Sequence, residues 1–379
     1  MRKVLLWLTR WLVGGVFLFS GFVKSVDAWG LAYKLEEYFE VFGLSGLDGL
    51  APFLSIIFNT LEMALGAAII MGFVPVLTTG LLVLLIVFFT FLTGYSALFN
   101  AVKDCGCFGD AIKLTPEQSF LKDVVLLVLT LFLWRGRAHI RPLGNARWAV
   151  YITLITAAVA FAMNYYSYRC DAIIDFRPYR PGNDIAQLMA IPEGAPVDEY
   201  RTTIIYRNKQ TGRTKEFAMN ALPDDTAWEW VETRNILVKE GYKPPIHDFI
   251  ISSAEGDDLT AEFLEDSGWK LLIVLRDLSS IRPRMVDKML SLVVGTAGMN
   301  GQPVKAWVVT AATPDEVQAF RKKYQALFDF YFMDHTTLKT ITRSNPGVLL
   351  LKGSTIKAKW SACHFPEVTD VLHAMNKTI

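Results

Sequence analysis

Apolar residues are concentrated in the first 165 residues of the chain, where long hydrophobic runs are broken by few charges. A helix needs about 20 mostly apolar residues to cross the hydrocarbon core of a bilayer. Five runs satisfy this requirement: residues 4–23, 53–71, 76–99, 120–134 and 148–165. The fourth run is short, but Lys122 near its start can extend its charged end to the membrane surface. The pattern therefore predicts an all-α bundle of five membrane spans over residues 1–166.

The first apolar run also fits a secretory signal peptide, because basic residues precede it. No small-x-small cleavage site follows Leu18, and the run is longer than the apolar region of a signal peptide. We therefore expect an uncleaved membrane anchor.

Residues 28–50 have a different pattern. Apolar residues recur at helical spacing, with charged residues between them; the apolar positions are Leu31, Leu35, Tyr38, Phe39 and Phe42, and the charged ones are Lys34, Glu36, Glu37 and Glu40. This pattern predicts an amphipathic helix that lies on the membrane surface.

Basic residues in short loops predict the orientation of the bundle, since such loops stay on the cytoplasmic side. Arg2 and Lys3 precede the first span, and Arg135, Arg137, Arg141 and Arg147 lie between or beside the fourth and fifth. With five spans, both groups are cytoplasmic, and residues 28–50, 100–119 and everything after 165 lie on the opposite side. We therefore expect a multi-pass protein of the bacterial inner (cytoplasmic) membrane, with a cytoplasmic N-terminus and a periplasmic C-terminal part.

After residue 170 the chain reads as a water-soluble protein. Residues 176–182 predict a linker, and the runs 200–206 and 213–219 predict a hairpin, so that residues 167–244 form a linker and small β-containing region. Residues 228–240 read as helical or irregular. From residue 245 strands and helices alternate: strands at 248–252, 271–275, 306–310, 330–333, 348–351 and 356–360, and helices at 259–264, 283–296, 314–327 and from 366. This alternation predicts a mixed sheet with helices on both faces over residues 245–379.

The composition of the chain limits which classes of binding partner we expect. The chain is 52% hydrophobic and 20% charged, with a net charge of +1. It has no basic patch that would neutralise phosphates, so we do not expect a nucleic acid partner. We expect the lipid bilayer and a periplasmic client or membrane-protein partner instead.

The most unusual cluster of residues is the string from Asp104 to Asp110, Asp-Cys-Gly-Cys-Phe-Gly-Asp, between the third and fourth spans. A disulfide between Cys105 and Cys107 would close a very small, strained ring, and strained disulfides are the easily reduced, exchangeable ones. Three alternatives remain: structural pairing with other cysteines, since four cysteines allow three connectivities; metal binding, although the nearest histidine, His139, is expected on the opposite side; and inert thiols. Cys170, just beyond the fifth span, is the natural resolving thiol.

Ionisable residues inside a span indicate either function or a buried pairing. Glu62 lies about halfway along the second span, on nearly the same helical face as Asn59 and Gly66. It is a candidate for proton handling or ligand binding, as in a transporter, or it is a buried carboxyl hydrogen-bonded to a neighbouring helix. Lys24 and Asp27, three residues apart at the end of the first span, predict an ion pair at a helix end.

Residues 20–27, Ser-Gly-Phe-Val-Lys-Ser-Val-Asp, together with the Glu62-x-x-x-Gly66 pattern and the Asp104–Asp110 string, resemble the DoxX-like membrane proteins and specifically their MauE branch. The resemblance implies a four-helix bundle, here with a fifth helix, and a role in periplasmic redox chemistry. MauE is named for methylamine utilisation and is associated with maturation of a disulfide-rich dehydrogenase subunit. For this chain, the resemblance implies a redox role for Cys105 and Cys107. It does not imply methylamine as a substrate, because nothing in the sequence points to an amine.

Residues 245–379 resemble a thioredoxin-like domain, with Asp248-Phe249 at its start and Asn345-Pro346-Gly347 where that fold keeps a cis-proline. We therefore expect a cis bond before Pro346. The stretch in place of the family's Cys-x-x-Cys motif, residues 276–283, contains no cysteine, which favours a docking module over a catalytic domain. Cys363, beside His364, is expected to be a buried small hydrophobe, or alternatively a thiol activated by the imidazole.

These patterns predict a membrane protein of thiol–disulfide chemistry or of partner maturation, with a non-catalytic thioredoxin-like docking domain. A quinone is a conceivable electron acceptor, and no other cofactor is evident. The alternative is a non-catalytic scaffold or assembly protein whose thioredoxin-like domain binds a partner.

Overall fold

The computed structural model describes residues 2–102, 106, 108–112, 114–218, 222–223, 227–239, 241–298, 303–326 and 328–377. The chain forms two compact units. One contains Met1–Asn183 and Ile250–Ile379, and the other contains Asp184–Phe249.

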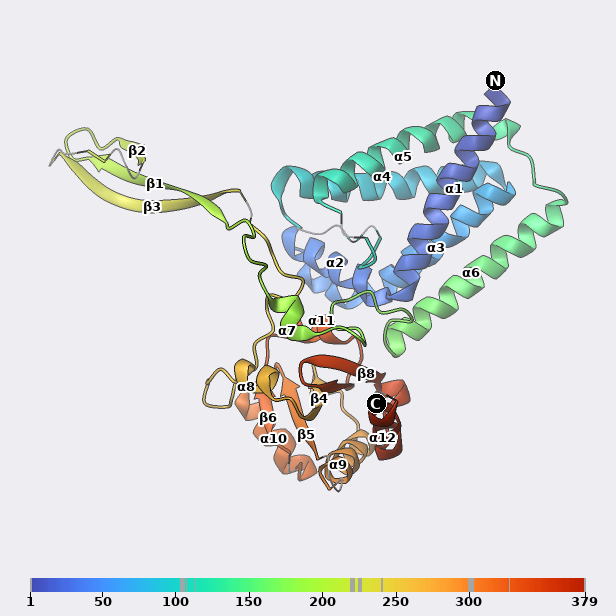
Figure 1. The fold of residues 1–379 in the computed structure, drawn as a ribbon. Helices are drawn as coiled ribbons and strands as arrows, with labels where there is room; N and C mark the ends of the chain where they lie inside the picture. Colours follow the sequence, from blue (N-terminus) through green and yellow to red (C-terminus); the bar gives the residue numbers. More distant parts are fainter. Residues whose placement is uncertain are drawn as a thin grey trace. The chain divides into compact units, whose positions relative to one another are not determined.

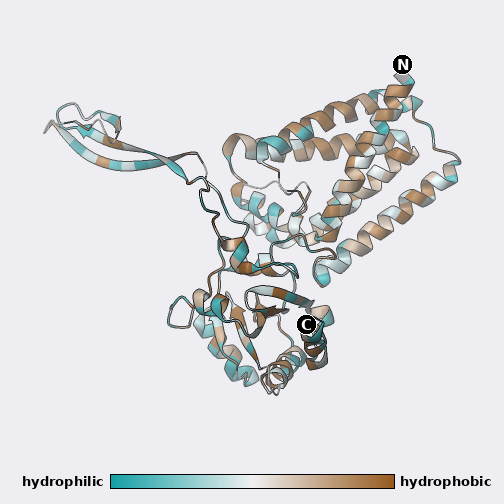
Figure 2. Ribbon diagram, in the orientation of Figure 1, coloured by the Kyte–Doolittle hydropathy of each residue, from teal (hydrophilic) through white to brown (hydrophobic). Residues whose placement is uncertain are grey.

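The N-terminal part of the first unit is helical (Figure 1). Its helices are α1 (Arg2–Val26), α2 (Ala28–Val41), α3 (Ala51–Met71), α4 (Pro75–Phe99), α5 (Pro116–Gly136) and α6 (Ala146–Arg169), with short 3-10 turns at Ser45–Leu50 and Arg137–His139. Among the described residues, four segments are long and apolar enough to cross a membrane: Lys3–Val26, Ser45–Met71, Pro75–Phe99 and Ala146–Arg169. Figure 2 shows their largely hydrophobic colouring. The fifth predicted span is helix α5, which contains Lys122, Asp123 and Arg135 and is not among the four.

Two glycines bring helices α1 and α3 unusually close together. A Cβ atom on Gly21 would come within 2.6 Å of the backbone nitrogen of Met63, and one on Gly66 within 2.6 Å of the backbone nitrogen of Leu18. Only glycine fits such close backbone contacts. This packing places Glu62 directly opposite the last turns of α1.

Helix α2 confirms the predicted amphipathic pattern, although it ends at Val41 and a 3-10 turn replaces the rest of the predicted helix. Its apolar face, with Leu31, Ala32 and Leu35, packs with Ala51 of α3. Its polar face remains open to the site described below.

The C-terminal domain confirms the predicted α/β organisation. A five-stranded mixed sheet has the order β6-β5-β4-β7-β8, in which β4 is parallel to β5 and antiparallel to β7. The strands are β4 (Trp269–Leu275), β5 (Val304–Thr310), β6 (Phe330–Phe332), β7 (Gly347–Lys352) and β8 (Thr355–Ser361), and the helices are α8 (Thr260–Glu265), α9 (Pro283–Ala297), α10 (Pro314–Tyr324), α11 (His335–Ile341) and α12 (Val368–Asn376).

Helices cover both faces of this sheet, and its central strand β4 is therefore buried on both sides. Leu271 and Ile273 of β4 share a core cluster with residues of α9, α10 and α12. On the other face, Phe263 of α8 packs edge-on against Trp307 of β5, with ring centroids 5.2 Å apart. The expected strand at 248–252 is absent, since Ser252 makes only isolated bridges, to Asp258 and Phe332.

The second unit contains the short helix α7 (Ile185–Met189) and a three-stranded antiparallel sheet of order β2-β1-β3. Strands β1 (Glu199–Asn208) and β2 (Thr214–Ala218) confirm the predicted hairpin. Strand β3 (Trp228–Lys239) corrects the helical or irregular prediction for that segment. It pairs along most of β1, and this pairing outweighs its weak local pattern.

Residues 171–183 are packed into the first unit, in contrast to the free linker expected from their sequence. Arg177 is buried, and its guanidinium contacts Asp171 and Asp175 at 2.7 Å each. The backbone of Gly182 and Asn183 hydrogen-bonds to Ile356 of β8 at 2.7 and 2.9 Å. The charge of Arg177 can be buried because two carboxylates accept its hydrogen bonds.

Candidate functional site: a cavity beside the Cys-Gly-Cys loop

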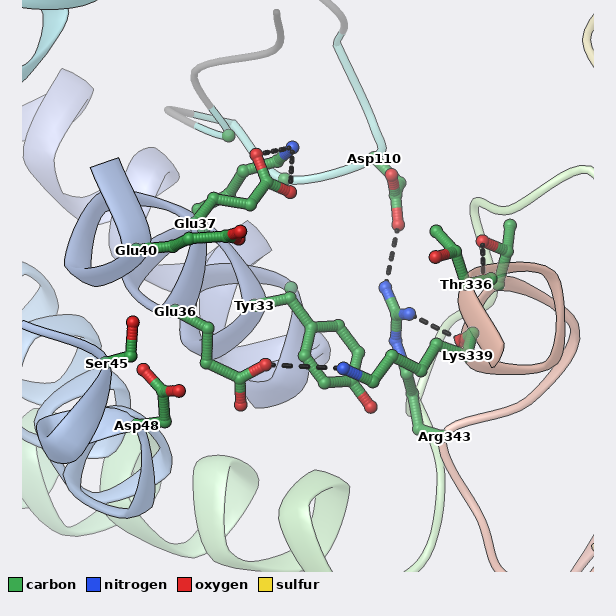
Figure 3. Close-up of a pocket in the computed structure, with 15 residues that line it drawn as sticks. Tyr33, Glu36, Glu37, Glu40, Ser45, Asp48, Asp110, Thr336, Lys339 and Arg343 are labelled. Atoms are coloured by element: carbon green, nitrogen blue, oxygen red, sulfur yellow. Dashed lines mark hydrogen bonds and ion pairs between the residues drawn. The ribbon is translucent and has the colours of Figure 1, made fainter. Parts of the chain in front are cut away.

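A cavity of about 640 Å³ lies where the helical part meets the C-terminal domain (Figure 3). Four segments line it: the polar face of α2, the 3-10 turn with Ser45 and Asp48, the described residues Gly106, Gly109 and Asp110 of the Cys-Gly-Cys loop, and α11 together with Arg343. The cavity is therefore shared by the sequence string with the most unusual chemistry and by the domain that resembles thioredoxin.

The cavity wall is strongly charged. It contains five carboxylates, Glu36, Glu37, Glu40, Asp48 and Asp110, and three cations, Lys34, Lys339 and Arg343. Lys34 pairs with Glu37 at 2.9 Å within α2, and Lys339 reaches across to Glu36 at 3.3 Å. Figure 3 shows this second pair bridging the opening. The lining is net negative because the carboxylates outnumber the cations.

Arg343 connects three segments at one edge of the cavity. Its Nε is 2.9 Å from Asp27 at the end of α1, and its Nη2 is 3.3 Å from Asp110 of the loop. Its Nη1 donates to the backbone oxygen of Lys339 at 2.6 Å. The predicted Lys24–Asp27 ion pair is wrong, because Asp27 pairs instead with this arginine, which only the fold brings near.

Tyr33 of α2 lies among three cations of the C-terminal domain. Nη1 of Arg276 donates to its hydroxyl at 2.5 Å, and Lys339 Nζ and the Arg343 guanidinium lie 4.4 and 5.1 Å from its ring centroid. Burial raises the pKa of Tyr33, and the positive charges of Arg276 and Arg343 offset this only in part. Tyr33 therefore stays neutral at physiological pH and acts as a hydrogen-bond acceptor for Arg276.

Arg276 is the first residue of the loop that replaces the thioredoxin-like Cys-x-x-Cys motif. Its backbone nitrogen donates to the Asn345 side chain at 2.9 Å, and Asn345 donates back to the Asp277 backbone oxygen at 2.7 Å. The Asn345–Pro346 bond is cis, which confirms the prediction for Pro346. The face of the domain that would carry a dithiol is thus turned to Tyr33 of the membrane part.

Cys105 and Cys107 lie outside the described residues, but Gly106 between them and Phe108 after them are described. Gly106 has a positive φ of 64°, which favours glycine, and a Cβ there would lie 3.1 Å from Cγ of Lys34. The Phe108 ring lies 5.6 Å from the ring of Phe19 and 5.1 Å from Nζ of Lys122. Gly106 and Phe108 therefore contact α2, α1 and α5.

Cys170 forms a disulfide with Cys363, with an S–S distance of 2.10 Å. The burial expected for Cys363 is wrong, because this residue is exposed next to His364. Cys170 is therefore not a free thiol, and a resolving role for it would require this bond to open first. The bond joins the end of α6 to the segment between β8 and α12.

Glu62 and Lys24 form a buried ion pair of 2.7 Å, and Ser20 donates to the second carboxylate oxygen at 2.9 Å. This arrangement supports the structural interpretation of Glu62, a carboxyl tied to a neighbouring helix. Sequence reasoning missed a second pair, Lys122 with buried Asp123 at 2.6 Å. An acidic residue inside a predicted span was the signal that could have revealed it.

The fold and the cavity define a multi-pass membrane protein with a C-terminal α/β domain compatible with the thioredoxin-like fold. Residues 2–136 match the family model described as methylamine utilisation protein MauE, so the N-terminal region is a MauE family membrane domain. Residues 200–240, which include most of the three-stranded sheet, match a domain of unknown function.

The chain is also similar to Protein TlpB of Flavobacterium psychrophilum, with 27% identity over 162 residues. The aligned region is 41% of this chain and 43% of TlpB. The chain therefore spans less than half the length of this relative.

Proposed function

We propose that this protein exchanges thiols and disulfides with a client protein through Cys105 and Cys107. The observation that carries the proposal is the shared cavity: Gly106, Gly109 and Asp110 line the same space as α11 and Arg343, which directly precede the cis-proline loop. A client segment in this cavity would lie beside both the Cys-Gly-Cys loop and the C-terminal domain.

The two parts of the protein complement each other in this proposal. The C-terminal domain has no cysteine in residues 276–283, so it cannot perform dithiol exchange at the position used by its relatives in fold. The membrane domain supplies a dithiol instead, and the C-terminal domain acts as the wall against which a client docks. Arg276 and Arg343 hold the wall against α2 and the loop.

The proposed reaction starts from the oxidised Cys105–Cys107 pair. A client thiolate attacks one of the two sulfurs, the Cys105–Cys107 bond breaks, and the released thiolate takes up a proton. A second client thiolate then attacks the mixed disulfide, which forms the client disulfide and releases the pair as two thiols. The client loses two electrons and two protons, and the pair gains them.

Repeated turnover requires that the two electrons leave the pair. A lipid-soluble quinone is the class of acceptor that a membrane domain can reach, and we assign this role to it. The proposal also retains five membrane spans, with the loop and the C-terminal domain in the periplasm, because thiol oxidation needs that compartment.

Thiol trapping in membranes of the producing cells tests the proposal. We expect Cys107→Ser or Cys105→Ser to accumulate a mixed disulfide with a client, visible as a reducible, higher-mass species, and the double variant to form none. A matched control is Cys170→Ser/Cys363→Ser, which removes the other pair and should leave the trapped species unchanged. Full client oxidation in the Cys105→Ser/Cys107→Ser variant would overturn the exchange function.

The alternative, a non-catalytic scaffold, rests on a different observation. The C-terminal domain is held by a disulfide and by ion pairs to Asp27, Glu36 and Asp110, an arrangement suited to a rigid docking platform. If the double serine variant still co-purifies its partner and supports full maturation of that partner, the scaffold function is the correct one.

A further inference from the structure

A second pocket, of about 450 Å³, lies at the N-terminal end of α1. The Cys-Gly-Cys loop is near the other end of this helix, where Gly109 lies close to Val23. The pocket is formed by the first turns of α1 and by residues 138–143, which follow α5. The pocket lies at the end of the bundle where α1 begins and α5 ends. The proposed exchange reaction does not use it.

The walls of this pocket are held in place by Arg10. Its Nε donates to the Ile69 oxygen at 2.6 Å, its Nη2 to the Ile70 oxygen, and its Nη1 to the Arg141 oxygen at 2.9 Å. These contacts cap the C-terminal end of α3, where free carbonyl groups attract a cation. A single buried side chain thus joins α1, α3 and the segment after α5.

Gly72 and Leu143 add to this support. Gly72 has a positive φ of 69°, and a Cβ there would come within 2.6 Å of the Arg141 oxygen, so only glycine allows the segment to approach. The backbone nitrogen of Leu143 donates to the Met71 oxygen at 2.9 Å. These backbone contacts fix the segment after α5 against the end of α3.

The pocket carries positive charge without a compensating acid. Lys3, Arg10 and Arg141 line it together with His139, and no aspartate or glutamate is among its lining residues. Within the described part of the chain, no carboxylate forms an ion pair with Lys3 or Arg141. Such a site attracts an anion.

The same pocket has an apolar side. Trp7 and Leu143 line it and are 51% and 40% exposed, and Leu8 on the next part of α1 is 53% exposed. Tryptophan is typical of the interface between lipid headgroups and hydrocarbon. An occupant must therefore combine an anionic head with apolar tails.

We propose that this pocket binds the phosphate headgroup of an anionic phospholipid, with its acyl chains along the exposed apolar face of α1. Lys3 and Arg141 contact the phosphate, and Arg10 holds the segment that presents Arg141. Basic pockets between membrane helices are sites where anionic lipid headgroups bind.

Native mass spectrometry of the full chain in detergent tests this proposal, with phosphatidylglycerol and phosphatidylcholine as probes. We expect phosphatidylglycerol to bind at least tenfold more tightly, and Lys3→Gln/Arg141→Gln to lose roughly tenfold or more of this affinity. The matched control is Arg135→Gln/Arg147→Gln, which removes two exposed charges from the same end of the bundle without touching the pocket. It should bind phosphatidylglycerol as the unmodified chain does.

Two results would overturn the proposal. One is an equal loss of affinity in the control and pocket variants, which would mean a general attraction of surface charge. The other is displacement of the lipid by millimolar inorganic phosphate, which would mean a site for a free anion. Retention of the lipid in phosphate, together with loss only in the pocket variant, supports the phospholipid site.

Discussion

Arg343 of the C-terminal domain and Asp27 at the end of α1 form an ion pair of 2.9 Å, and the same guanidinium lies 3.3 Å from Asp110 of the Cys-Gly-Cys loop. One mostly buried side chain thus joins the membrane domain, the loop and the segment before the cis-proline. This relationship makes Arg343 the residue through which the position of the C-terminal domain and that of the loop are coupled.

We expect Arg343→Gln to weaken the contact between the two domains by about 3 kcal/mol, because Asp27 would be left without its partner. Hydrogen exchange measured by mass spectrometry should show faster exchange in α2 and α11. Arg284→Gln, a change at an exposed arginine of α9, is the control and should leave both helices unchanged. Equal exchange in the two variants would show that the Arg343 bridge contributes no stability.

The Cys170–Cys363 disulfide encloses a long stretch of chain, with a sequence separation of 193. Loop-closure entropy for such a length stabilises the folded state by at most about 5 kcal/mol, and by less here because the membrane already restrains the end of α6. We expect Cys170→Ser/Cys363→Ser to lower the melting temperature of the C-terminal domain by several degrees. Peptide mapping without reductant should recover the linked 170–363 peptides from the unmodified chain, and their absence would contradict the pairing.

Variants of the Lys24–Glu62 pair distinguish a structural role of this pair from a functional one. Glu62→Gln leaves the Lys24 charge buried without its partner and should destabilise the bundle by about 3 to 5 kcal/mol. Lys24→Met/Glu62→Leu removes both charges, and we expect it to recover most of the loss in a thermal melt in detergent. A double variant that is as stable as the unmodified chain but inactive in client oxidation would reveal a proton-handling role for this pair.

Stability should fall in acid because of Asp171. Burial alone would raise the pKa of this carboxyl, but the charges of Arg177 and Lys359 outweigh burial, so the pKa lies below its ordinary value of 3.8. The unfolded carboxyl then takes up a proton at higher pH than the folded one. Its contribution is complete above the ordinary value and is lost as pH falls through the folded pKa. Melting temperatures of Asp171→Asn should depend less on pH below 4 than those of the unmodified chain, and parallel curves would refute this.

The effect of Lys359 on stability falls in the alkaline range, whereas that of Asp171 falls in acid. Burial and the nearby Arg177 lower its pKa from 10.5 to about 8, despite the attraction of Asp171 and Asp175. Between these values the unfolded lysine holds more protons than the folded one, so stability should increase as pH rises from 8 to 10.5, by about 3 kcal/mol in total. In Lys359→Met this increase should disappear, as measured by chemical denaturation across that range. A rise that persists in the variant would assign the effect to another group.

Much of the fold could be predicted from local pattern. The apolar runs identified α1 and α3 to α6, and the alternation after residue 245 identified the strands of the five-stranded sheet. The cis bond at Pro346 was implied by the resemblance to the thioredoxin-like fold. Strand β3 was missed because its alternation is weak and its pairing with β1 is what holds it extended. The segment around Arg177 was predicted to be a linker because its composition is polar and contains proline. That composition does not reveal that Asp171 and Asp175 pair with Arg177 and allow its charge to be buried.

Within the candidate site, the loop string and the amphipathic helix were recognisable in the chain, and their common cavity was not. Cavity walls come from residues such as Glu36 and Lys339, which are more than 300 positions apart. No local pattern relates such residues.

Hydrophobic periodicity acts over a few turns or strand repeats, so it is sufficient to divide this chain into a membrane part and an α/β part. The spacing of Cys105 and Cys107, and the charge of Glu62 inside an apolar run, mark these residues as unusual. Pairing depends on which segments pack together. Tertiary structure alone decided that Lys24 pairs with Glu62, that Asp27 pairs with Arg343, and that Cys170 bonds to Cys363. Ion pairs and disulfides form only over a few ångströms, and the folded chain determines which side chains come that close.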